Sequence, residues 1–479
     1  MTERALSDDV IARFREIVGD AHALTAPDDQ AGYLREWRDR YVGKAALVLR
    51  PASTDEVSRI LALANSLGIG VVPQGGNTGL VGGQIPSQRG DQVVLSLSRM
   101  KSVRDVDADG GAMVVEAGVT LADAQAVAEK AQRLFPLSLA SEGSAQIGGV
   151  LASNAGGTAV LAYGNARNLC FGLEVVLADG RVWNGLRTLK KDNTGYDLRD
   201  LMIGSEGTLG VITAAVLKLL PRPACTATAI LGLKSPEDAL KVFRLAEQAA
   251  CGALTAFEFW TRRALDFALA SLPNSRDPLR DKHLWYILIE VSCSDGGGSA
   301  SGLLENVLHA ALQDDIIEDA SVAISTKQAR DFWRLRESFS EAQKSAGGSI
   351  KHDISVPISA IPEFLERAAV VVEAICPGAR PVPFGHFGDG NLHYNVSQPE
   401  GLSTEGEDKA RFLDLWTEMS DAIHALVTTM NGSISAEHGI GQMKRAALVQ
   451  HKSAVEIDLM RAIKTALDPK GVLNPGKVL

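Results

Sequence analysis

The chain has 479 residues, of which 46% are hydrophobic and 22% are charged, with 48 basic and 58 acidic side chains. These fractions are ordinary for a soluble globular protein and exclude a disordered or fibrous chain. The formal net charge of −10 argues against a general binder of nucleic acid or of anionic membranes. No apolar run is long enough to span a membrane, and the N-terminus lacks the apolar core of a signal peptide, so we expect a cytoplasmic protein of two or three domains.

Five cysteines are scattered along the chain, and no two form a CxxC pair. This spacing argues against an iron–sulfur cluster or a cysteine-rich zinc module built from this chain alone, and it fits a reducing compartment. Glycine is the unusual residue: there are 46, about a tenth of the chain, where roughly 7% is typical.

The first elements predicted are a strand at 46–49, a helix between Ser53 and Gly68, and a strand at 70–73. Ser53 and Glu56 have the spacing of a capping box, apolar residues then recur at helical spacing, and Gly68 ends the pattern. The same kind of signal continues to about residue 220, with strands at 93–97 and 113–116 and a helix at 121–130 capped by Thr120. This part is expected to form one α+β domain.

The pattern changes after Pro221 and Pro223. The elements predicted next are strands at 226–231 and 285–291, helices at 236–250 and 301–312, and a glycine-containing loop at Ser294–Ser299. They favour a sheet covered by helices on one face. The stretch from 409 to 479 is predicted to be mainly helical.

A glycine-rich segment, Gly75–Gly83, directly follows the strand predicted at 70–73. Closely spaced glycines let consecutive backbone N–H groups face one concave point that suits phosphate oxygens. No Lys-Ser/Thr pair follows, so this is not a Walker loop, and the chain contains no GxGxxG motif. Taken alone, the segment could also be a flexible surface loop.

Two further clusters of small residues lie at 141–157 and at Gly204–Gly210. Such runs are costly in backbone entropy and make sense where the backbone approaches a flat ligand or another backbone. Tight helix packing could explain any one of the three clusters. Three of them in one domain favour a large cofactor that carries a pyrophosphate.

Two histidines, His386 and His393, flank Asp389-Gly390, a favoured hairpin turn. If these two residues form the turn, the histidines pair directly across the strands with Cβ atoms about 5 Å apart. That spacing suits two ligands of one divalent ion. The alternative to a metal site is that both histidines have a purely structural role. If the turn differs from the predicted one, the two histidines do not pair directly.

An adjacent acid and imidazole, Glu437 and His438, offer an oxygen ligand and a base that titrates near neutral pH. Together with the two histidines, Glu437 would complete a three-ligand catalytic metal site, whereas a solvated pair at a helix end would have no such meaning. Arg336 and Lys351 stay unassigned from the residues alone, although a protein with this acidic balance must turn some cations inward to bind an anion.

With these residues in view, the chain resembles the FAD-linked oxidoreductases of the vanillyl-alcohol-oxidase type, and among them most closely the D-2-hydroxyglutarate dehydrogenases. The resemblance runs from about residue 40 to the C-terminus. It rests on the motifs PQGGNTGLVGG, KKDNTGYDL, GSEGTLGVIT, GHFGDGNLH, SAEHG and DPKGVLNPGK. It implies an α+β fold with an FAD-binding domain over 1–222, an α+β substrate-binding domain over 223–408, and a helical C-terminal segment over 409–479 that completes the active site.

The resemblance assigns FAD to the glycine clusters, with the first cradling the pyrophosphate and the second lining the flavin. No His or Cys lies in the pyrophosphate loop, so non-covalent FAD is expected. The residues expected at FAD are Pro73, Gly75, Gly76, Asn77, Thr78, Gly79, Gly82, Gly83, Ser141, Gly143, Ser144, Gly148, Gly149, Ser153, Asn154, Gly156, Glu206, Gly207, Ile212 and Asn474.

The resemblance also implies that His386, His393 and Glu437 bind a divalent metal, for which zinc is best suited and manganese or cobalt acceptable. His438 would be the catalytic base. The residues expected to contact substrate are Arg336, Ser340, Lys351, Asn395 and His438. Ser340 stands where these relatives have threonine and keeps the hydroxyl, and a lysine at position 351 favours a small 2-hydroxy-dicarboxylate over a monocarboxylate.

The activity implied is oxidation of D-2-hydroxyglutarate to 2-oxoglutarate, with hydride transfer to flavin N5 and onward transfer to an acceptor such as electron-transfer flavoprotein or a quinone. Two alternatives stay open. One is a D-lactate, D-malate or glycolate dehydrogenase of the same superfamily, and the other is a flavin subunit of a multi-subunit oxidase. The oligomeric state is also open, with a homodimer as one alternative.

Overall fold

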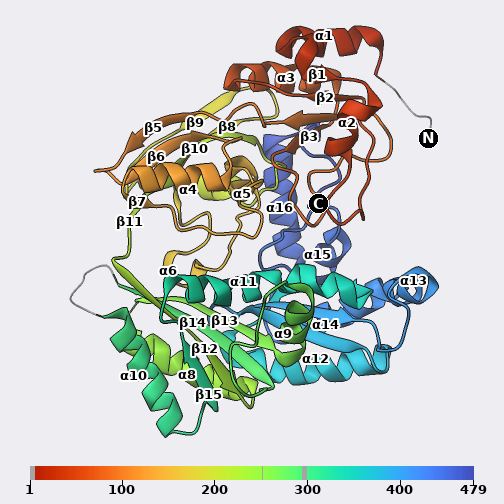
Figure 1. Ribbon diagram of the computed structural model, residues 1–479. Helices are drawn as coiled ribbons and strands as arrows, with labels where there is room; N and C mark the ends of the chain where they lie inside the picture. The colour runs from red at the N-terminus through yellow and green to blue at the C-terminus, as the bar shows by residue number, and fades with distance from the viewer. Residues whose placement is uncertain (1–5, 251, 294–298) are drawn as a thin grey trace. The chain divides into compact units, whose positions relative to one another are not determined.

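The computed structural model describes residues 6–250, 252–293 and 299–479, and these form two compact units (Figure 1). The loop predicted at Ser294–Ser299 lies almost wholly outside the described residues. Within the described ranges, no helix combines the length and the apolar character needed to cross a membrane.

The two units are not continuous in sequence. Unit 1 contains the chain up to Gly157, Gly164–Pro221 and Glu437–Leu479, and unit 2 contains Thr158–Tyr163 and Arg222–Ala436. The sequence predicts one helical segment over 409–479. In the structure the last 43 residues, from Glu437 onward, belong instead to the unit that holds the glycine-rich loops.

Unit 1 is built on three sheets. The first has the order β1-β2-β4-β3 and the second the order β5-β6-β10-β8-β9, while β11 and β7 form a two-stranded ribbon. Strands β2, β4 and β3 are parallel. The strands are β1 (Ala23–Leu24), β2 (Leu47–Leu49), β3 (Val71–Gln74), β4 (Val93–Ser96), β5 (Val103–Asp107), β6 (Ala112–Glu116), β7 (Arg133–Leu134), β8 (Cys170–Val176), β9 (Val182–Gly185), β10 (Val211–Lys218) and β11 (Leu220–Pro221).

The helices of unit 1 are α1 (Asp8–Val18), α2 (Pro27–Leu34), α3 (Thr54–Leu67), α4 (Leu121–Lys130), α5 (Ile147–Ala152), α7 (Leu198–Met202), α15 (Arg445–His451) and α16 (Ala454–Leu467). The predicted signals of α3 are confirmed: Ser53 accepts a hydrogen bond from the Glu56 backbone N–H, and Gly68 ends the helix at φ 69°. The reciprocal half of the capping box is absent, because the Glu56 carboxylate accepts from the N–H of Ala52 rather than of Ser53. Helix α4 and its Thr120 cap are as predicted.

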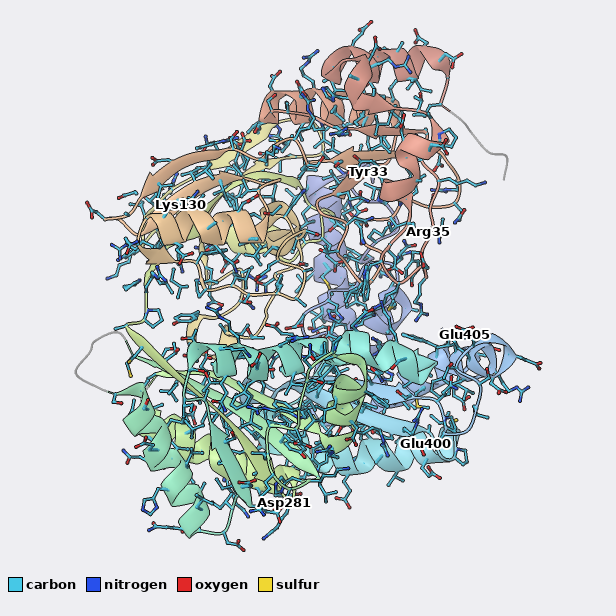
Figure 2. All side chains as sticks on the ribbon, viewed as in Figure 1. Tyr33, Arg35, Lys130, Asp281, Glu400 and Glu405 are labelled. Carbon is cyan, nitrogen blue, oxygen red and sulfur yellow. The ribbon has the colours of Figure 1, made fainter. Side chains whose placement is uncertain are left out.

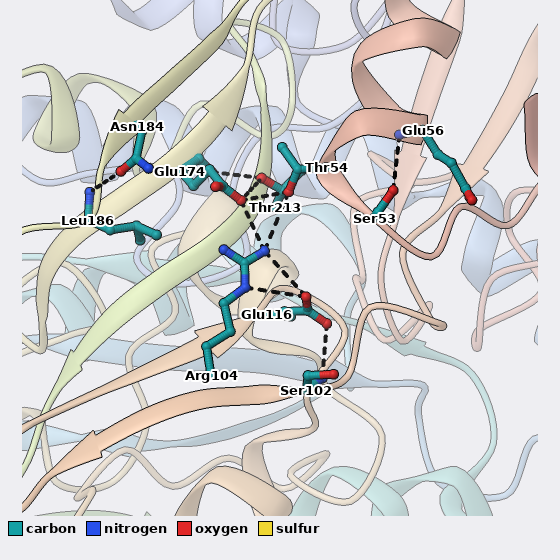
Figure 3. A network of polar contacts seen from close by, with 10 residues as sticks. All are labelled: Ser53, Thr54, Glu56, Ser102, Arg104, Glu116, Glu174, Asn184, Leu186 and Thr213. Carbon is teal, nitrogen blue, oxygen red and sulfur yellow. Dashed lines mark hydrogen bonds and ion pairs between the residues drawn. The ribbon is translucent and has the colours of Figure 1, made fainter.

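A polar network centred on the buried Glu174 links α3 to the five-stranded sheet (Figure 3). Glu174 Oε1, on β8, accepts from Thr54 Oγ1 at 2.6 Å, from Thr213 Oγ1 at 2.9 Å and from Arg104 Nη2 at 3.2 Å. Arg104 also pairs with Glu116 at 3.3 Å. These bonds join α3 to strands β5, β6, β8 and β10 of the five-stranded sheet.

Unit 2 is built on one sheet of eight strands, with the path β15-β12-β14-β13-β18-β19-β16 and with β17 also paired to β19. The strands are β12 (Cys225–Leu233), β13 (Leu254–Thr261), β14 (Trp285–Cys293), β15 (Asp319–Val322), β16 (Ser349–Ile350), β17 (Asp353–Ser355), β18 (Arg380–His386) and β19 (Asn391–Ser397). The helices are α6 (Val160–Tyr163), α8 (Pro236–Ala250), α9 (Arg262–Ser271), α10 (Ala300–Gln313), α11 (Thr326–Ala342), α12 (Ile361–Ile375), α13 (Gly406–Asp414) and α14 (Trp416–Thr429).

The prediction that helices cover one face of this sheet is wrong. Residues such as Phe257 and Phe259 on β13 pack into a core with α8, α10, α12 and α14, while Trp260 packs on the opposite face with α9 and α11. Both faces of the central strands are therefore buried. The sequence signal was the continuous apolar character of β12 to β14, which is typical of strands covered on two sides.

Candidate functional site

The loop Gly75–Gly83 follows β3 and is braced by amide side chains. Gln74 Nε2 donates to the carbonyl oxygens of Tyr33 and Gln84, at 2.9 and 3.0 Å. Asn77, which lies at φ 55°, donates to the carbonyls of Gly32 and Arg35 at 3.0 and 2.9 Å. Tyr33 and Arg35 are labelled in Figure 2, at and just after α2. A loop that is costly in conformational entropy is thus held in one conformation by its neighbours.

Two predicted cofactor clusters meet in unit 1. A methyl group at Gly76 would lie 1.8 Å from the carbonyl oxygen of Ser144, and one at Gly75 would lie 3.4 Å from the Gln146 side chain. Only glycine allows the backbones to approach this closely. Gln146 Oε1 is buried and has no hydrogen-bond partner among the described residues. Nearby in the chain, a methyl group at Gly149 would meet no atom within 4 Å, so there is open space at that position. A buried acceptor beside open space fits a site for a bound cofactor.

The remaining predicted cofactor residues surround these loops or lie near them in the chain. Gly207 packs against Pro73, where a methyl group would lie 3.0 Å from the proline ring. The N–H of Ser144 donates to the Ser141 carbonyl, and Asn154, at φ 51°, accepts from the Arg167 N–H at 3.0 Å. The other predicted residues lie in or beside these clusters: Thr78, Gly79 and Gly82 in the first loop, Gly143, Ser153 and Gly156 in the second cluster outside its helix, Gly148 in α5, and Ile212 on β10.

Glu206 and Asn474 connect the loops to the C-terminal segment. The Glu206 carboxylate accepts from the backbone N–H groups of Ile440 and Gly441, at 2.7 and 2.8 Å. Asn474 Nδ2 donates to the carbonyls of Gly83 and Glu206, at 3.0 and 2.8 Å. Burial raises the pKa of Glu206, and the two N–H groups oppose that effect. The side chain of Glu206, predicted to lie along the cofactor, therefore holds the segment that follows His438.

Glu437 and His438 lie at the start of this C-terminal segment in unit 1. Glu437 Oε1 accepts from the backbone N–H of Gly157 at 3.2 Å. A carboxylate oxygen of Glu437 and a ring nitrogen of His438 lie within 4.8 Å of each other. Gly439, at φ 81°, follows, and a methyl group there would lie 2.8 Å from Glu206 Oε1. The backbone that follows the predicted base is thus held by the Glu206 carboxylate.

The hairpin of unit 2 has a different register from the predicted one. Strand β18 ends at His386, residues Phe387–Asp389 form a 3-10 turn, and Gly390 returns the chain at φ 84°. His386 is paired with Asn391 and His393 with Phe384, so the direct pairing of the two histidines is wrong. The loop has four residues rather than two. Because His386 and His393 are now diagonal neighbours on one face, their ring centroids are still only 5.7 Å apart.

Asp353 lies beside these histidines, although the sequence analysis assigned it no role. It is paired with His393 in the β17–β19 register, and its carboxylate lies within 4.8 Å of a ring nitrogen of His393. Asn391 Nδ2 donates to Asp353 Oδ1 at 3.1 Å. An acid and an imidazole at this separation can bind one divalent ion.

His386 is held by a buried acid, Glu258 on β13. His386 Nδ1 and Glu258 Oε1 are 2.8 Å apart, and Arg336 Nε donates to Glu258 Oε2 at 2.7 Å. Burial by itself raises the pKa of Glu258, but its electrostatic interactions and hydrogen bonds with His386 and Arg336 outweigh that effect and bring the pKa below its ordinary value. Glu258 is therefore ionised at neutral pH. The signal in the sequence was one charged residue inside the apolar run Leu254–Thr261, and the sequence analysis missed it.

Three predicted substrate residues come together in unit 2. Arg336 and Ser340 lie one turn apart on α11, and Lys351 Nζ donates to the Ser340 carbonyl at 3.1 Å. Arg336 is buried and Ser340 is exposed. The fourth, Asn395 on β19, is buried and donates through Nδ2 to Gln343 Oε1 at 2.9 Å. Ser340 thus links the two cationic residues, because Arg336 precedes it by one turn of α11 and Lys351 bonds its carbonyl oxygen. Guanidinium and ammonium groups are the side chains that suit a carboxylate.

Two family models match the chain: an FAD binding domain over residues 45–185 and the C-terminal domain of FAD linked oxidases over residues 222–478. A probable mitochondrial D-2-hydroxyglutarate dehydrogenase of Oryza sativa subsp. indica is 37% identical over 99% of this chain and 82% of its own length. A D-2-hydroxyglutarate–pyruvate transhydrogenase of Saccharomyces cerevisiae is 35% identical over 99% and 95%.

A solved structure of p-cresol methylhydroxylase matches the fold with a TM-score of 0.77 at 16% identity, over 98% of this chain and 96% of that one. This likeness extends across both units and concerns the fold alone. The fold is thus similar to that of the vanillyl-alcohol-oxidase type. The family models and the sequence relatives show that the chain belongs to the FAD-linked oxidases, in the branch of the FAD-dependent 2-hydroxy-acid dehydrogenases.

Proposed function

We propose that the protein oxidises D-2-hydroxyglutarate to 2-oxoglutarate. The observation that carries the choice of substrate is the arrangement of Arg336, Ser340 and Lys351. Lys351 Nζ lies 3.1 Å from the carbonyl oxygen of Ser340, and Ser340 follows Arg336 by one turn of α11. A monocarboxylate has no group that needs these two cations in addition to the centre where it reacts, whereas the second carboxylate of a dicarboxylate does.

In this proposal each side chain has a separate task. When bound, FAD would accept the hydride and a divalent metal would act as a Lewis acid on the hydroxyl. His438 takes the hydroxyl proton, and Arg336 and Lys351 orient the substrate through its distal carboxylate. Glu206 holds the backbone after His438, so the position of the base depends on it.

The chemistry of the donors supports a metal held by His386, His393 and Glu437. The two histidine rings lie on one face of a rigid hairpin, with centroids 5.7 Å apart. With Nδ1 of His386 engaged by Glu258, Nε2 is the ring nitrogen suited to bind a metal. Two imidazoles and one carboxylate are typical of catalytic zinc and also accept manganese or cobalt. Asp353 is a further oxygen donor beside His393.

The experiment that tests the proposal is anaerobic. Purified, metal-replete protein is mixed with D-2-hydroxyglutarate, D-lactate or D-malate, and the flavin absorption band is followed. Fast bleaching by D-2-hydroxyglutarate with little response to D-lactate supports it. Preference for D-lactate would keep the reaction type and overturn the substrate, and bleaching by none of the three would point to an untested acid or to a partner-dependent flavin subunit.

The electron acceptor has two candidate classes. The first class is an external electron carrier, such as an electron-transfer flavoprotein or a quinone. The second class is a 2-oxo acid, which is favoured because the yeast relative is a D-2-hydroxyglutarate–pyruvate transhydrogenase. The substrate-reduced flavin is then offered pyruvate without oxygen. Return of the flavin band with formation of lactate supports the transhydrogenase, and no return supports an external electron carrier.

A further inference from the structure

We infer that Glu258 is a positioning residue that sets the orientation of both His386 and Arg336, so that one buried carboxylate controls metal affinity and recognition of the distal carboxylate together. The inference rests on the proposed function, because it takes His386 as a metal ligand and Arg336 as a substrate residue. It assigns a role to an acid that touches neither metal nor substrate.

The geometry places Glu258 between the two residues. In the β13–β18 register Glu258 is directly paired with His386, and Glu258 Oε1 lies 2.8 Å from His386 Nδ1. The other oxygen, Oε2, faces Arg336 on α11, at 2.7 Å from Nε and 2.6 Å from Nη2. Glu258 is 1% exposed, so water does not compete for either oxygen. Each oxygen has one partner.

A purely structural ion pair is the simpler explanation, and energetics argue against it. Burying an ionised carboxylate is costly, and a buried ion pair is often no more stabilising than apolar residues of the same size. The neighbours Phe257 and Phe259 show that this strand is built to bury apolar groups. A charge kept at this position is better explained by what it does to its partners.

For His386 the effect is on the ring nitrogens. An ionised carboxylate only accepts hydrogen bonds, so Nδ1 carries the proton and Nε2 presents its lone pair. A histidine ligand held by a carboxylate in this way has a set orientation and is more basic, and loss of such a partner typically costs about 10- to 100-fold in metal affinity.

For Arg336 the effect is on the plane of the guanidinium. Its Nε donates to Glu258 Oε2, and its Nη2 lies 2.6 Å from the same oxygen as an ion pair. The guanidinium carbon lies 5.2 Å from the ring centroid of Phe384 and 6.0 Å from that of Phe339. The planar group is therefore held by one charge and two rings. Without the charge of Glu258, the guanidinium would stay buried but would lose the hydrogen bond that fixes the orientation of its plane.

The test is Glu258→Gln, which keeps the shape and removes the charge. Variant and wild type are purified with FAD, stripped of metal with a chelator and titrated with zinc against a chromogenic chelator, a readout that needs no turnover. We expect zinc to bind about 10- to 100-fold more weakly, with FAD content unchanged. After reloading with saturating zinc, KM for D-2-hydroxyglutarate should rise more than KM for D-lactate.

The matched control is Glu290→Gln on the adjacent strand β14. Its carboxylate accepts from Thr228 Oγ1 and Trp333 Nε1, at 2.9 and 2.8 Å, with no hydrogen bond to His386. Zinc affinity should be unchanged in this variant. If it falls as far as in Glu258→Gln, any loss of a carboxylate in the sheet has the same effect and the inference is overturned.

Wild-type zinc affinity in Glu258→Gln would also overturn the inference. If that variant does not fold, Glu258→Asp keeps the charge but is too short by one methylene group to reach both partners, so weaker zinc binding is again expected and unchanged binding overturns the role. A wild-type protein that binds no zinc, or that no 2-hydroxy acid bleaches, contradicts the proposed function instead, so the two failures are distinguishable.

Discussion

The two units organise their polar groups in different ways. In unit 1 the predicted cofactor loops are largely irregular backbone, and the single side chains of Glu206 and Asn474 tie them to the C-terminal segment. In unit 2 the predicted metal and substrate residues His386, His393 and Asn395 lie on regular strands, and their neighbours are charged or amide side chains buried in an apolar sheet.

This difference predicts which kind of substitution should impair each unit. Four residues of the predicted cofactor loops, Asn77, Asn154, Glu206 and Asn474, have positive φ although none is glycine. Such conformations persist only when the surrounding structure over-determines them. Substitutions in unit 1 should therefore act through the position of backbone and base, and substitutions in unit 2 should act through charge.

The largest effect is expected from His438→Asn in unit 1. Removal of the proposed base should lower the rate of anaerobic flavin reduction on the order of 10²- to 10⁴-fold, while FAD stays bound because the loops do not depend on this ring. Stopped-flow absorbance with D-2-hydroxyglutarate measures the rate, and the flavin-to-protein ratio is the control. A nearly normal rate would contradict the assignment of His438.

Glu206→Gln tests whether unit 1 works through backbone position. The variant loses one acceptor and the charge that hold the N–H groups of Ile440 and Gly441. We expect kcat to fall roughly 10- to 100-fold with little change in KM, because a base displaced by about 1 Å reacts far more slowly. Glu16→Gln, an exposed acid on α1, is the control. A change confined to KM would show that Glu206 acts on binding instead.

Lys351→Ala tests whether unit 2 works through charge. Loss of one charge-assisted contact should lower kcat/KM for D-2-hydroxyglutarate by about tenfold and leave D-lactate nearly unaffected. Lys327→Ala, which removes an exposed lysine paired with Asp331 on α11, is the control. Equal losses for both substrates would argue for a 2-hydroxy-monocarboxylate instead.

The smallest effect is expected from Glu174→Gln, in the network that joins the sheets of unit 1. Burial alone raises the pKa of Glu174, but bonds from Thr54, Arg104 and Thr213 bring it below 4.5. A lowered pKa means that this contribution is present above the ordinary carboxyl pKa and is lost as the pH falls through the folded-state value. Urea unfolding should show a loss of about 1–2 kcal/mol at pH 7 that shrinks below pH 4.5. A constant difference would contradict the linkage.

The locally encoded parts of the fold could be predicted. Helix α8 has the predicted limits, Pro236–Ala250, and α4 has the predicted limits and cap. The clusters at Gly75–Gly83 and 141–157, which the sequence predicts to share one cofactor, approach each other at Gly76 and Ser144. These features follow from apolar periodicity, capping residues and glycine spacing, which act over a few neighbouring residues.

Features that depend on distant residues could not be predicted. The turn after His386 has four residues rather than two, and Gly390 within it packs closely on a distant segment, where a methyl group would lie 2.3 Å from the carbonyl oxygen of Val356. Glu258 meets Arg336 across 78 residues and His386 across 128. No local pattern encodes such distances.

The sequence by itself determined the family, the cofactor loops and the residue types available for the reaction, because glycine clusters and paired motifs are local chemical signals. Only the tertiary structure decided that the segment from Glu437 belongs with the glycine loops, that the histidines are diagonal neighbours, and that Glu258 holds His386 and Arg336. The physical reason is that register, burial and ion pairing arise from packing between segments far apart in the chain.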